Sequence, residues 1–389
     1  MDSFGYWMPT EVVLGVGCFS ALGERCRALG GKALVVTGKR SARASGALER
    51  ALAQLAEAVV FDAVEENPSI ETCAQGAALC RGSGCDVVVG LGGGSAMDAA
   101  KAIALLAVNP DTCEAYLAGE APQRPHLPVA AAPTTAGTGS EVTPYAVLVE
   151  RRAASAEGRR LNKRTLRGIF PAVALLDPQL SVTMPRAVTL STGLDALSQA
   201  MEGMVSGKST PIGDITALET CRVVRTWLPR TVADATDLEA RAWMLYAAML
   251  SGITIAQSGT TLVHGMGYYF TLEHGVPHGL ANALLLTPLF QYNARQAPQT
   301  VAALAAALGF PCEATPTDAA RAIADALHAL LAQLAVSPAA SDAGVDPTRL
   351  RWCAEQVFAD RGRFKNQRGE PTLDEVYGFF QQACDGTKR

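Results

Sequence analysis

Up to about residue 180, short apolar runs alternate with Ala-rich segments, and this alternation constrains the fold more than any other feature of the chain. Each run is bounded by Gly, Pro or polar residues, which is typical of buried strands. The predicted strands are Ala33–Thr37, Val59–Phe61, Asp86–Gly90, Val129–Ala132 and Val173–Leu176. Near-continuous apolar strands alternating with helices are typical of a parallel sheet covered on both faces, so we expect a doubly wound α/β domain.

After Asp177–Pro178 the strand signals stop and long amphipathic segments follow. The predicted helices are roughly Gly193–Val205, Ile212–Leu228, Leu238–Ile255, Thr317–Leu334 and Leu373–Ala383. We therefore expect an α/β domain over residues 1–182 and an all-α domain over residues 183–389. At about 150 residues per domain, the chain is long enough for two cores, and the default place for a ligand is between them.

The composition argues against several classes of protein. Charged residues make up 18% of the chain, with 33 Lys and Arg against 37 Asp and Glu, so a nucleic-acid-binding protein and a disordered chain are poor interpretations. The apolar stretches fall short of the ~18 residues of a membrane span, and the start has no signal-peptide pattern. The ten cysteines form no CxxC pair, so we expect reduced thiols in a cytoplasmic enzyme.

Two glycine-rich loops follow predicted strands. The phosphate-binding residues predicted in the first loop are Gly92, Gly93, Gly94, Ser95 and Asp98. Glycines let the backbone approach a phosphate closely, and the helix that opens after them has its positive end towards that phosphate. The second loop, Pro133–Thr143, carries four threonines. Its hydroxyl groups suit a ligand's phosphate or amide groups, and they also suit turns that cap their own backbone.

The pair of sequences GGGSAMDAAK and PTTAGTGSEVT resembles the iron-containing (group III) alcohol dehydrogenases, as do the stretches Phe4–Gly17, Pro171–Glu202 and His264–Leu286. The resemblance covers essentially the whole chain. It implies a dehydroquinate synthase-like architecture, with a Rossmann-like domain that binds NAD or NADP and a helical domain that holds a divalent metal. It also implies a small alcohol or aldehyde substrate and a homodimer or larger oligomer. The residues that it adds to the cofactor site are Thr134, Thr135 and Thr138.

The choice of cofactor depends on the end of the first predicted strand, which continues into Gly38, Lys39 and Arg40. In dinucleotide-binding folds an acidic residue after a strand binds the ribose 2′-OH of NAD, whereas basic residues accommodate the 2′-phosphate of NADP. NAD-using relatives resemble one another in placing Asp where Gly38 stands. We therefore expect NADP(H) to be preferred over NAD(H), the alternative being that Lys39 and Arg40 are ordinary solvated charges.

Four residues are candidates for a metal site. Asp195 and Gln199 stand four residues apart and so share one face of a predicted helix, whereas His264 and His278 lie beside Gly-rich turns. The family's metal site is an Asp, a His four residues later and two more His, so three positions match and Gln199 replaces the fourth ligand. A carboxamide oxygen is a weaker donor than imidazole for Fe²⁺ or Zn²⁺. Binding by Asp195, His264 and His278, with or without Gln199, is the leading hypothesis.

A second departure from the family concerns proton transfer. Tyr268 stands where relatives commonly have a histidine thought to relay the alcohol proton, and a phenol with a pKa near ~10 is a poor relay at neutral pH. His274, four residues before His278, is an alternative relay. Ile255 and Gln257 also differ from the relatives. The sequence thus predicts an NAD(P)-dependent alcohol dehydrogenase or aldehyde reductase. A metal-independent reductase that uses Tyr268 or His274 and a catalytically silent cofactor-binding protein remain as alternatives.

Overall fold

The computed structural model describes residues 3–109, 112–151 and 161–386 of the chain. These residues form two compact units. One unit is Trp7–Met184, and the other runs from Pro185 onward and takes in the first residues up to Tyr6. The change of unit thus falls two residues after the boundary expected at 182/183. Among the described residues, no helix combines the length and the apolar character needed to cross a bilayer.

The first unit is built on a six-stranded sheet with the order β1-β8-β5-β4-β2-β3, in which every pair of neighbours is parallel. Its strands are β1 (Glu11–Leu14), β2 (Ala33–Gly38), β3 (Ala58–Val64), β4 (Val87–Gly92), β5 (Val129–Pro133) and β8 (Val173–Leu176). The five strands predicted from apolar runs are all present, each within a few residues of its expected bounds. The expectation of a doubly wound parallel sheet is therefore confirmed.

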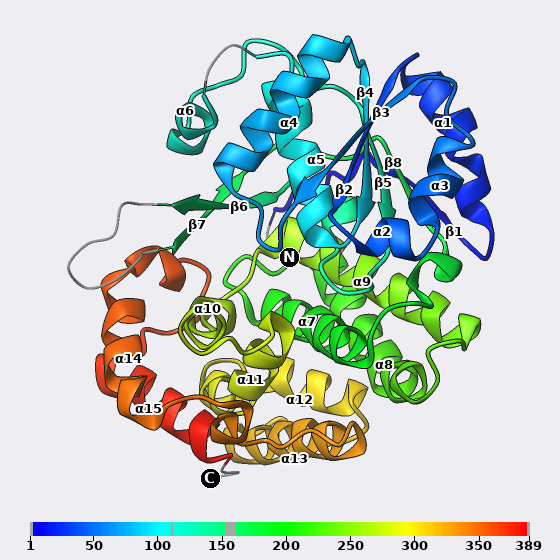
Figure 1. The fold of residues 1–389 in the computed structure, drawn as a ribbon. Helices are drawn as coiled ribbons and strands as arrows, with labels where there is room; N and C mark the ends of the chain where they lie inside the picture. Colours follow the sequence, from blue (N-terminus) through cyan, green and yellow to red (C-terminus); the bar gives the residue numbers. More distant parts are fainter. Residues whose placement is uncertain (1–2, 110–111, 152–160, 387–389) are drawn as a thin grey trace. The chain divides into compact units, whose positions relative to one another are not determined.

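Alternate residues along each strand pack into two separate cores, because successive side chains point to opposite faces of a sheet. Val35 and Val89 belong to the core that includes residues of α1 (Leu22–Leu29) and α3 (Ala47–Leu52). Leu34 and Val88 belong to the core that includes residues of α4 (Ile70–Ser83) and α5 (Gly94–Leu106). Figure 1 shows these helices on either side of the sheet. The helices of this unit are α1 (Leu22–Leu29), α2 (Ser41–Ala44), α3 (Ala47–Leu52), α4 (Ile70–Ser83), α5 (Gly94–Leu106) and α6 (Cys113–Ala118).

An antiparallel hairpin of β6 (Ala146–Arg151) and β7 (Leu161–Leu166) forms a second, two-stranded sheet that the sequence analysis did not predict. The β7 sequence, LNKRTL, carries two adjacent cations and has none of the apolar continuity of the parallel strands. Its pairing with β6 supplies the backbone hydrogen bonds instead. Strand prediction from apolar runs therefore misses it for a clear physical reason.

The second unit is helical, as expected. Its helices are α7 (Arg186–Val205), α8 (Pro211–Ala233), α9 (Leu238–Ser258), α10 (Leu262–His274), α11 (His278–Gln296), α12 (Pro298–Ala307), α13 (Pro316–Gln333), α14 (Leu350–Ala359) and α15 (Leu373–Asp385). From Gly193 to Val205 every residue of α7 is buried, because this helix packs against α8, α9 and α11. A helix buried on all sides can carry inward-facing polar groups only if they are paired.

Some boundaries in the helical unit differ from the predicted ones. Helix α7 begins at Arg186, directly after Pro185, and so starts about two turns before the helix start expected near Gly193. Helix α11 begins at His278 with Pro277 at its N-cap, and proline is common where helices start. All ten cysteines are free thiols, and all but Cys18 and Cys312 are buried.

Candidate active site

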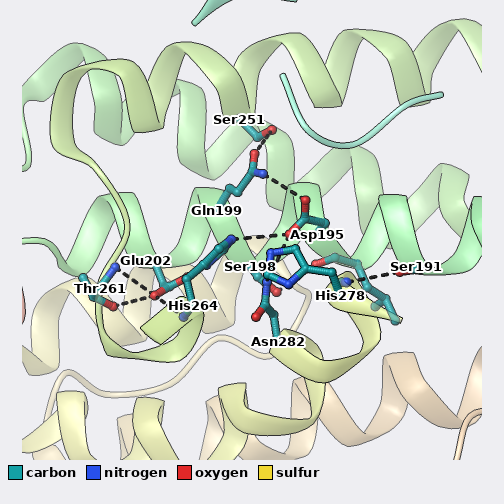
Figure 2. Close-up of polar contacts among 12 residues, drawn as sticks. Ser191, Asp195, Ser198, Gln199, Glu202, Ser251, Thr261, His264, His278 and Asn282 are labelled. Carbon is teal, nitrogen blue, oxygen red and sulfur yellow. Dashed lines mark hydrogen bonds and ion pairs between the residues drawn. The ribbon is translucent and has the colours of Figure 1, made fainter. Parts of the chain in front are cut away.

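Three polar residues on α7 point to one side of that helix. Asp195, Gln199 and Glu202 stand at positions i, i+4 and i+7, a spacing that places them on one helical face. Their exposed fractions are 5%, 5% and 0%. Because a buried carboxylate is costly unless it is hydrogen-bonded, the two acids require partners from other helices. His264 on α10 and Asn282 on α11 are among these partners, and Ser251 on α9 is a partner of Gln199 (Figure 2).

Asp195, His264 and His278 converge in the helical unit. One ligand atom from each residue lies within 4.8 Å of the other two. The Nε2 atom of His264 is 3.4 Å from Oδ1 of Asp195, and the two imidazole rings meet edge to face with centroids 5.4 Å apart. The residues come from three helices, α7, α10 and α11, so the tertiary fold brings together what the sequence separates by 69 and 14 positions.

Glu202 holds His264 in place, a role that the sequence analysis missed. Its Oε2 atom hydrogen-bonds Nδ1 of His264, and its Oε1 atom accepts from the backbone N–H of Thr261 at 2.8 Å and the Thr261 hydroxyl at 2.8 Å. With Nδ1 engaged by the carboxylate, Nε2 is the atom that His264 presents to Asp195. A carboxylate behind a ligating histidine is a common feature of metal centres. The signal in the sequence was the seven-residue spacing from Asp195.

Charged and hydrogen-bonded neighbours outweigh burial in setting the pKa values of His264 and Asp195. Burial alone would lower the pKa of His264, but the charge of Glu202 and hydrogen bonds with Asp195 and Glu202 raise it to about 10. Burial alone would raise the pKa of Asp195, but the hydrogen bond with His264 and the nearby His278 outweigh it and hold that pKa below its usual value. Without a metal the triad is therefore a carboxylate beside an imidazolium, and a divalent cation binding there would displace the proton.

These residues fit the divalent metal that the sequence predicts. Two imidazoles and one carboxylate are a familiar ligand set for Zn²⁺ and Fe²⁺, and that set leaves positions open for water or substrate. Their donor atoms converge, and Glu202 fixes the tautomer of His264. Gln199, the fourth predicted ligand, has a protein partner at both ends of its amide. Its Nε2 atom lies 3.0 Å from Oδ2 of Asp195, and its Oε1 atom lies 3.1 Å from the Ser251 hydroxyl.

The two predicted proton relays lie in different places. The Tyr268 ring stacks on that of His278, with centroids 5.1 Å apart and planes 6° from parallel, so its phenol belongs to the surroundings of the triad. His274 is the last residue of α10, and its Nδ1 atom accepts from the backbone N–H of Asp346. Burial lowers the pKa of His274. None of the contacts described for His274 joins it to the triad.

In the α/β unit the two glycine-rich loops pack directly on each other. A Cβ atom on Gly94 would lie 2.7 Å from Cγ2 of Thr138, and one on Gly93 would lie 3.2 Å from Cγ2 of Thr135. The backbone N–H of Thr134 donates to the carbonyl oxygen of Gly92 at 2.9 Å. Substitution at either glycine would therefore push the loops apart. Glycine is thus needed at these two positions for the packing of the loops, besides allowing a phosphate to approach.

Helix α5 starts at Gly94 with no side chain capping its first turn, because Gly93 at the N-cap has none. Uncapped N–H groups at the positive end of a helix fit a phosphate, so this end of α5 fits the predicted pyrophosphate. Ser95 accepts from the backbone N–H of Asn67 at 3.1 Å. The Thr138 hydroxyl accepts from the backbone N–H of Ser140 at 3.3 Å, so the second loop also caps its own backbone.

Asp98 has partners inside the protein. It lies one turn into α5, where Oδ1 accepts from the Ser140 hydroxyl at 2.6 Å and Oδ2 accepts from the backbone N–H of Val147 at 3.0 Å. Lys101, fully buried, donates to the Ser140 hydroxyl at 2.9 Å and to the carbonyl oxygens of Thr143 and Tyr145 at 2.9 and 2.7 Å. Asp98 and Lys101 thus tie α5 to the end of the second loop.

The residues expected to select the cofactor lie at the end of β2. Gly38 is the last residue of that strand, and Lys39 and Arg40 follow it with exposed side chains. A Cβ atom on Gly38 would meet only the carbonyl oxygen of Val64, at 3.6 Å, which is an ordinary contact. The position therefore has room for a side chain and carries none.

Comparison with known proteins decides the family. The sequence model of the iron-containing alcohol dehydrogenases matches residues 9–178, and the model of the C-terminal part of that family matches residues 189–384. The chain belongs to the iron-containing alcohol dehydrogenase family. Membership makes it an oxidoreductase that acts on CH–OH groups, and the family implies a nicotinamide dinucleotide and a divalent metal.

Several relatives in this alcohol dehydrogenase family match over nearly their whole length. The 1,3-propanediol dehydrogenase of Citrobacter freundii is 34% identical over 98% of both chains. A crystal structure of a 1,3-propanediol oxidoreductase has a TM-score of 0.90 at 32% identity and covers 98% of this chain and 100% of its own. The sulfoacetaldehyde reductase of Bifidobacterium kashiwanohense, solved in complex with NAD⁺, has a TM-score of 0.85 at 30% identity and covers 99% of each.

Proposed function

We propose that this chain is a metal-assisted alcohol dehydrogenase or aldehyde reductase that favours NADP(H). The observation that carries the proposal is the convergence of Asp195, His264 and His278, with Glu202 fixing His264 from behind. The balanced reaction is alcohol plus NADP⁺ giving aldehyde, NADPH and a proton. When bound, the metal polarises the substrate oxygen and the nicotinamide C4 accepts or donates the hydride.

The chain's own residues provide binding and orientation. Asp195, His264 and His278 hold the cation, and Glu202 keeps Nε2 of His264 turned towards it. In the α/β unit the start of α5 takes the pyrophosphate. The residues proposed to position the dinucleotide there are Gly92, Gly93, Gly94, Ser95, Thr134, Thr135 and Thr138. Asp98 acts on that site indirectly, through its hydrogen bonds to Ser140 and Val147.

Elemental analysis tests the metal assignment. The full-length chain is purified without a metal-affinity tag, reconstituted with Fe²⁺ or Zn²⁺, and assayed with NADPH and NADH for aldehyde reduction and with 1,3-propanediol for oxidation. We expect close to one metal per chain, loss of that metal in His264→Ala, and loss of activity with it. Turnover that persists in a chain without metal would contradict the metal-assisted reaction.

A second candidate reaction is favoured by the Tyr268 ring, which stacks on His278 at 5.1 Å. In a metal-independent reductase this phenol would donate the proton to the nascent alkoxide as a general acid. Activity that resists a strong chelator but falls at least about a hundredfold in Tyr268→Phe would favour that reaction. Activity lost to the chelator and restored by Zn²⁺ would favour the metal.

The preference for NADP(H) is tested at Gly38. Gly38→Asp places a carboxylate where the ribose 2′-OH of NAD would be bound, and it fits because a Cβ atom there meets only Val64 O at 3.6 Å. We expect the ratio of kcat/KM with NADPH to that with NADH to fall at least about tenfold, since a carboxylate repels the 2′-phosphate. Lys39→Ala serves as the matched control and should weaken NADPH alone. An unchanged ratio in Gly38→Asp would contradict the preference.

A further inference from the structure

Gln199 occupies the place where the family has a histidine ligand, and both ends of its carboxamide have partners. Its Nε2 atom lies 3.0 Å from Oδ2 of Asp195, and its Oε1 atom lies 3.1 Å from the hydroxyl of Ser251 on α9 (Figure 2). Its exposed fraction is 5%, so the side chain is largely shielded from solvent. The side chain is therefore held between two helices.

The orientation of this amide follows from chemistry. The oxygens of a carboxylate accept hydrogen bonds, and Oδ2 of Asp195 accepts one from the side chain of Gln199. The Gln199 atom 3.0 Å from that carboxylate must be the NH₂ group, because an oxygen there would be repelled. The amide oxygen consequently faces Ser251. The single hydroxyl proton of Ser251 serves either Gln199 Oε1 or the carbonyl oxygen of Ala248 at 2.8 Å.

The two oxygens of Asp195 have different partners. Oδ2 accepts from Gln199, whereas Oδ1 lies 3.1 Å from Nδ2 of Asn282 and 3.4 Å from Nε2 of His264. The bond from Gln199 therefore fixes the rotation of the carboxylate and leaves Oδ1 on the side of the histidine. Hydrogen bonds that orient a ligating carboxylate in this way contribute to metal affinity without contacting the metal.

We propose that Gln199 is a positioning residue and not a metal ligand. It donates to Asp195 while Ser251 holds its other end, and the cation is bound by three protein donors, Asp195, His264 and His278. The proposal rests on the proposed function for its metal. Its consequence is one more coordination position open to water or substrate than in a centre with a fourth protein ligand.

Four variants of the full-length apo-protein test this role through their zinc affinity, measured by competition with a chromophoric chelator. Ser251→Ala and Gln199→Leu should each weaken zinc binding about tenfold, and the double variant should be no weaker than Gln199→Leu alone, because Ser251 acts through Gln199. Gln199→His should tighten zinc binding at least tenfold by adding an imidazole. An unchanged zinc affinity in both Ser251→Ala and Gln199→Leu would overturn the proposal.

Cobalt substitution separates positioning from ligation. If Gln199 only positions Asp195, the visible d–d bands of the Co²⁺ protein keep their shape and intensity in Gln199→Leu and change in Gln199→His. A Gln199→Leu spectrum that differs from wild type as much as that of Gln199→His would overturn the proposal. A zinc-loaded crystal structure with Gln199 Oε1 within the ~2.0–2.2 Å of a zinc–oxygen bond would also overturn it.

The metal-free protein keeps this test separate from the proposed function. In the apo-protein, Gln199→Leu should lower the thermal midpoint of the helical unit by about 5 °C, because Asp195 loses a donor while it stays buried. A wild-type chain that binds no zinc would overturn the proposed function and the three-donor centre. In that case the thermal midpoints of the metal-free proteins would be the remaining test of the positioning role. Equal midpoints in wild type and Gln199→Leu would overturn that role as well.

Discussion

One buried carboxyl group, that of Glu141, makes the stability of the α/β unit depend on pH. Glu141, in the second glycine-rich loop, is 1% exposed, and its Oε1 atom has no hydrogen-bond partner. Burial raises the pKa of Glu141 to about 7, and the charge of Lys101 offsets part of that cost. The folded chain therefore binds this proton more tightly than the unfolded chain. Stability from Glu141 is present at low pH and is lost as the pH rises from about 4.5 to 7.

Glu141→Gln should remove this loss. We expect the variant to be more stable than wild type at pH 8 by up to about 3 kcal/mol, reduced by the attraction that Lys101 loses, with little difference at pH 4.5. Thermal unfolding by calorimetry at the two pH values measures the gap. Glu66→Gln makes the same substitution at an exposed position and is the matched control. A gap that is the same at pH 4.5 and 8 would contradict the assignment.

At the level of elements, the contact between α7 and α11 places His278. A Cβ atom on Gly279 would lie 1.8 Å from the backbone oxygen of Ser191 and 2.8 Å from Cβ of Asp195. No side chain fits there without a shift of one helix. The glycine after His278 therefore sets the distance between the helix that carries Asp195 and the helix that carries His278.

Gly279→Ala should cost about 3 kcal/mol or more of folding stability and weaken zinc binding, because α11 must move away from α7. Gly378→Ala in α15 is the control, since a Cβ there meets nothing within 4 Å, and it should stabilise by about 0.5–1 kcal/mol. Chemical denaturation and chelator competition measure both effects. Wild-type zinc affinity in Gly279→Ala would show that the spacing is not needed.

Much of this arrangement follows from local sequence, and some of it does not. The parallel strands were predictable because each is a short apolar run, and the start of α11 was predictable from Pro277. The hairpin was not, since Lys163 and Arg164 lie in its second strand. The shared face of Asp195 and Gln199 on α7 was visible as a four-residue spacing. The partner of the Gln199 amide oxygen was not, because Ser251 lies 52 residues away on another helix. Long-range contacts of this kind carry no local signal.

At the scale of the whole molecule, the chain divides into two compact units, and each unit carries its own candidate site. The metal triad draws all its residues from α7, α10 and α11, whereas the glycine-rich loops belong to the α/β unit. A ligand that binds one set of residues lowers the opening rate of the unit that holds them. The metal and the dinucleotide should therefore each protect a different set of backbone amides from hydrogen exchange.

Hydrogen exchange measured by mass spectrometry checks this. Zn²⁺ should slow exchange mainly in peptides from α7, α10 and α11, and NADP⁺ should slow it mainly around the loops that follow β4 and β5. Zinc added to His264→Ala is the control and should have little effect. Zinc protection spread equally over Trp7–Met184 would contradict a centre built within the helical unit.

The reactivity of the buried thiols reports how often the structure around each of them opens. Five of them, Cys26, Cys73, Cys80, Cys85 and Cys113, lie in the α/β unit, and three, Cys221, Cys353 and Cys384, lie in the helical unit. A thiol-reactive reagent will reach the partly exposed Cys18 and Cys312 first and the others only as fast as the surrounding structure opens. The rates at which the mass increases, assigned to individual cysteines by peptide analysis, would thus measure the opening rates of each unit in the wild-type protein.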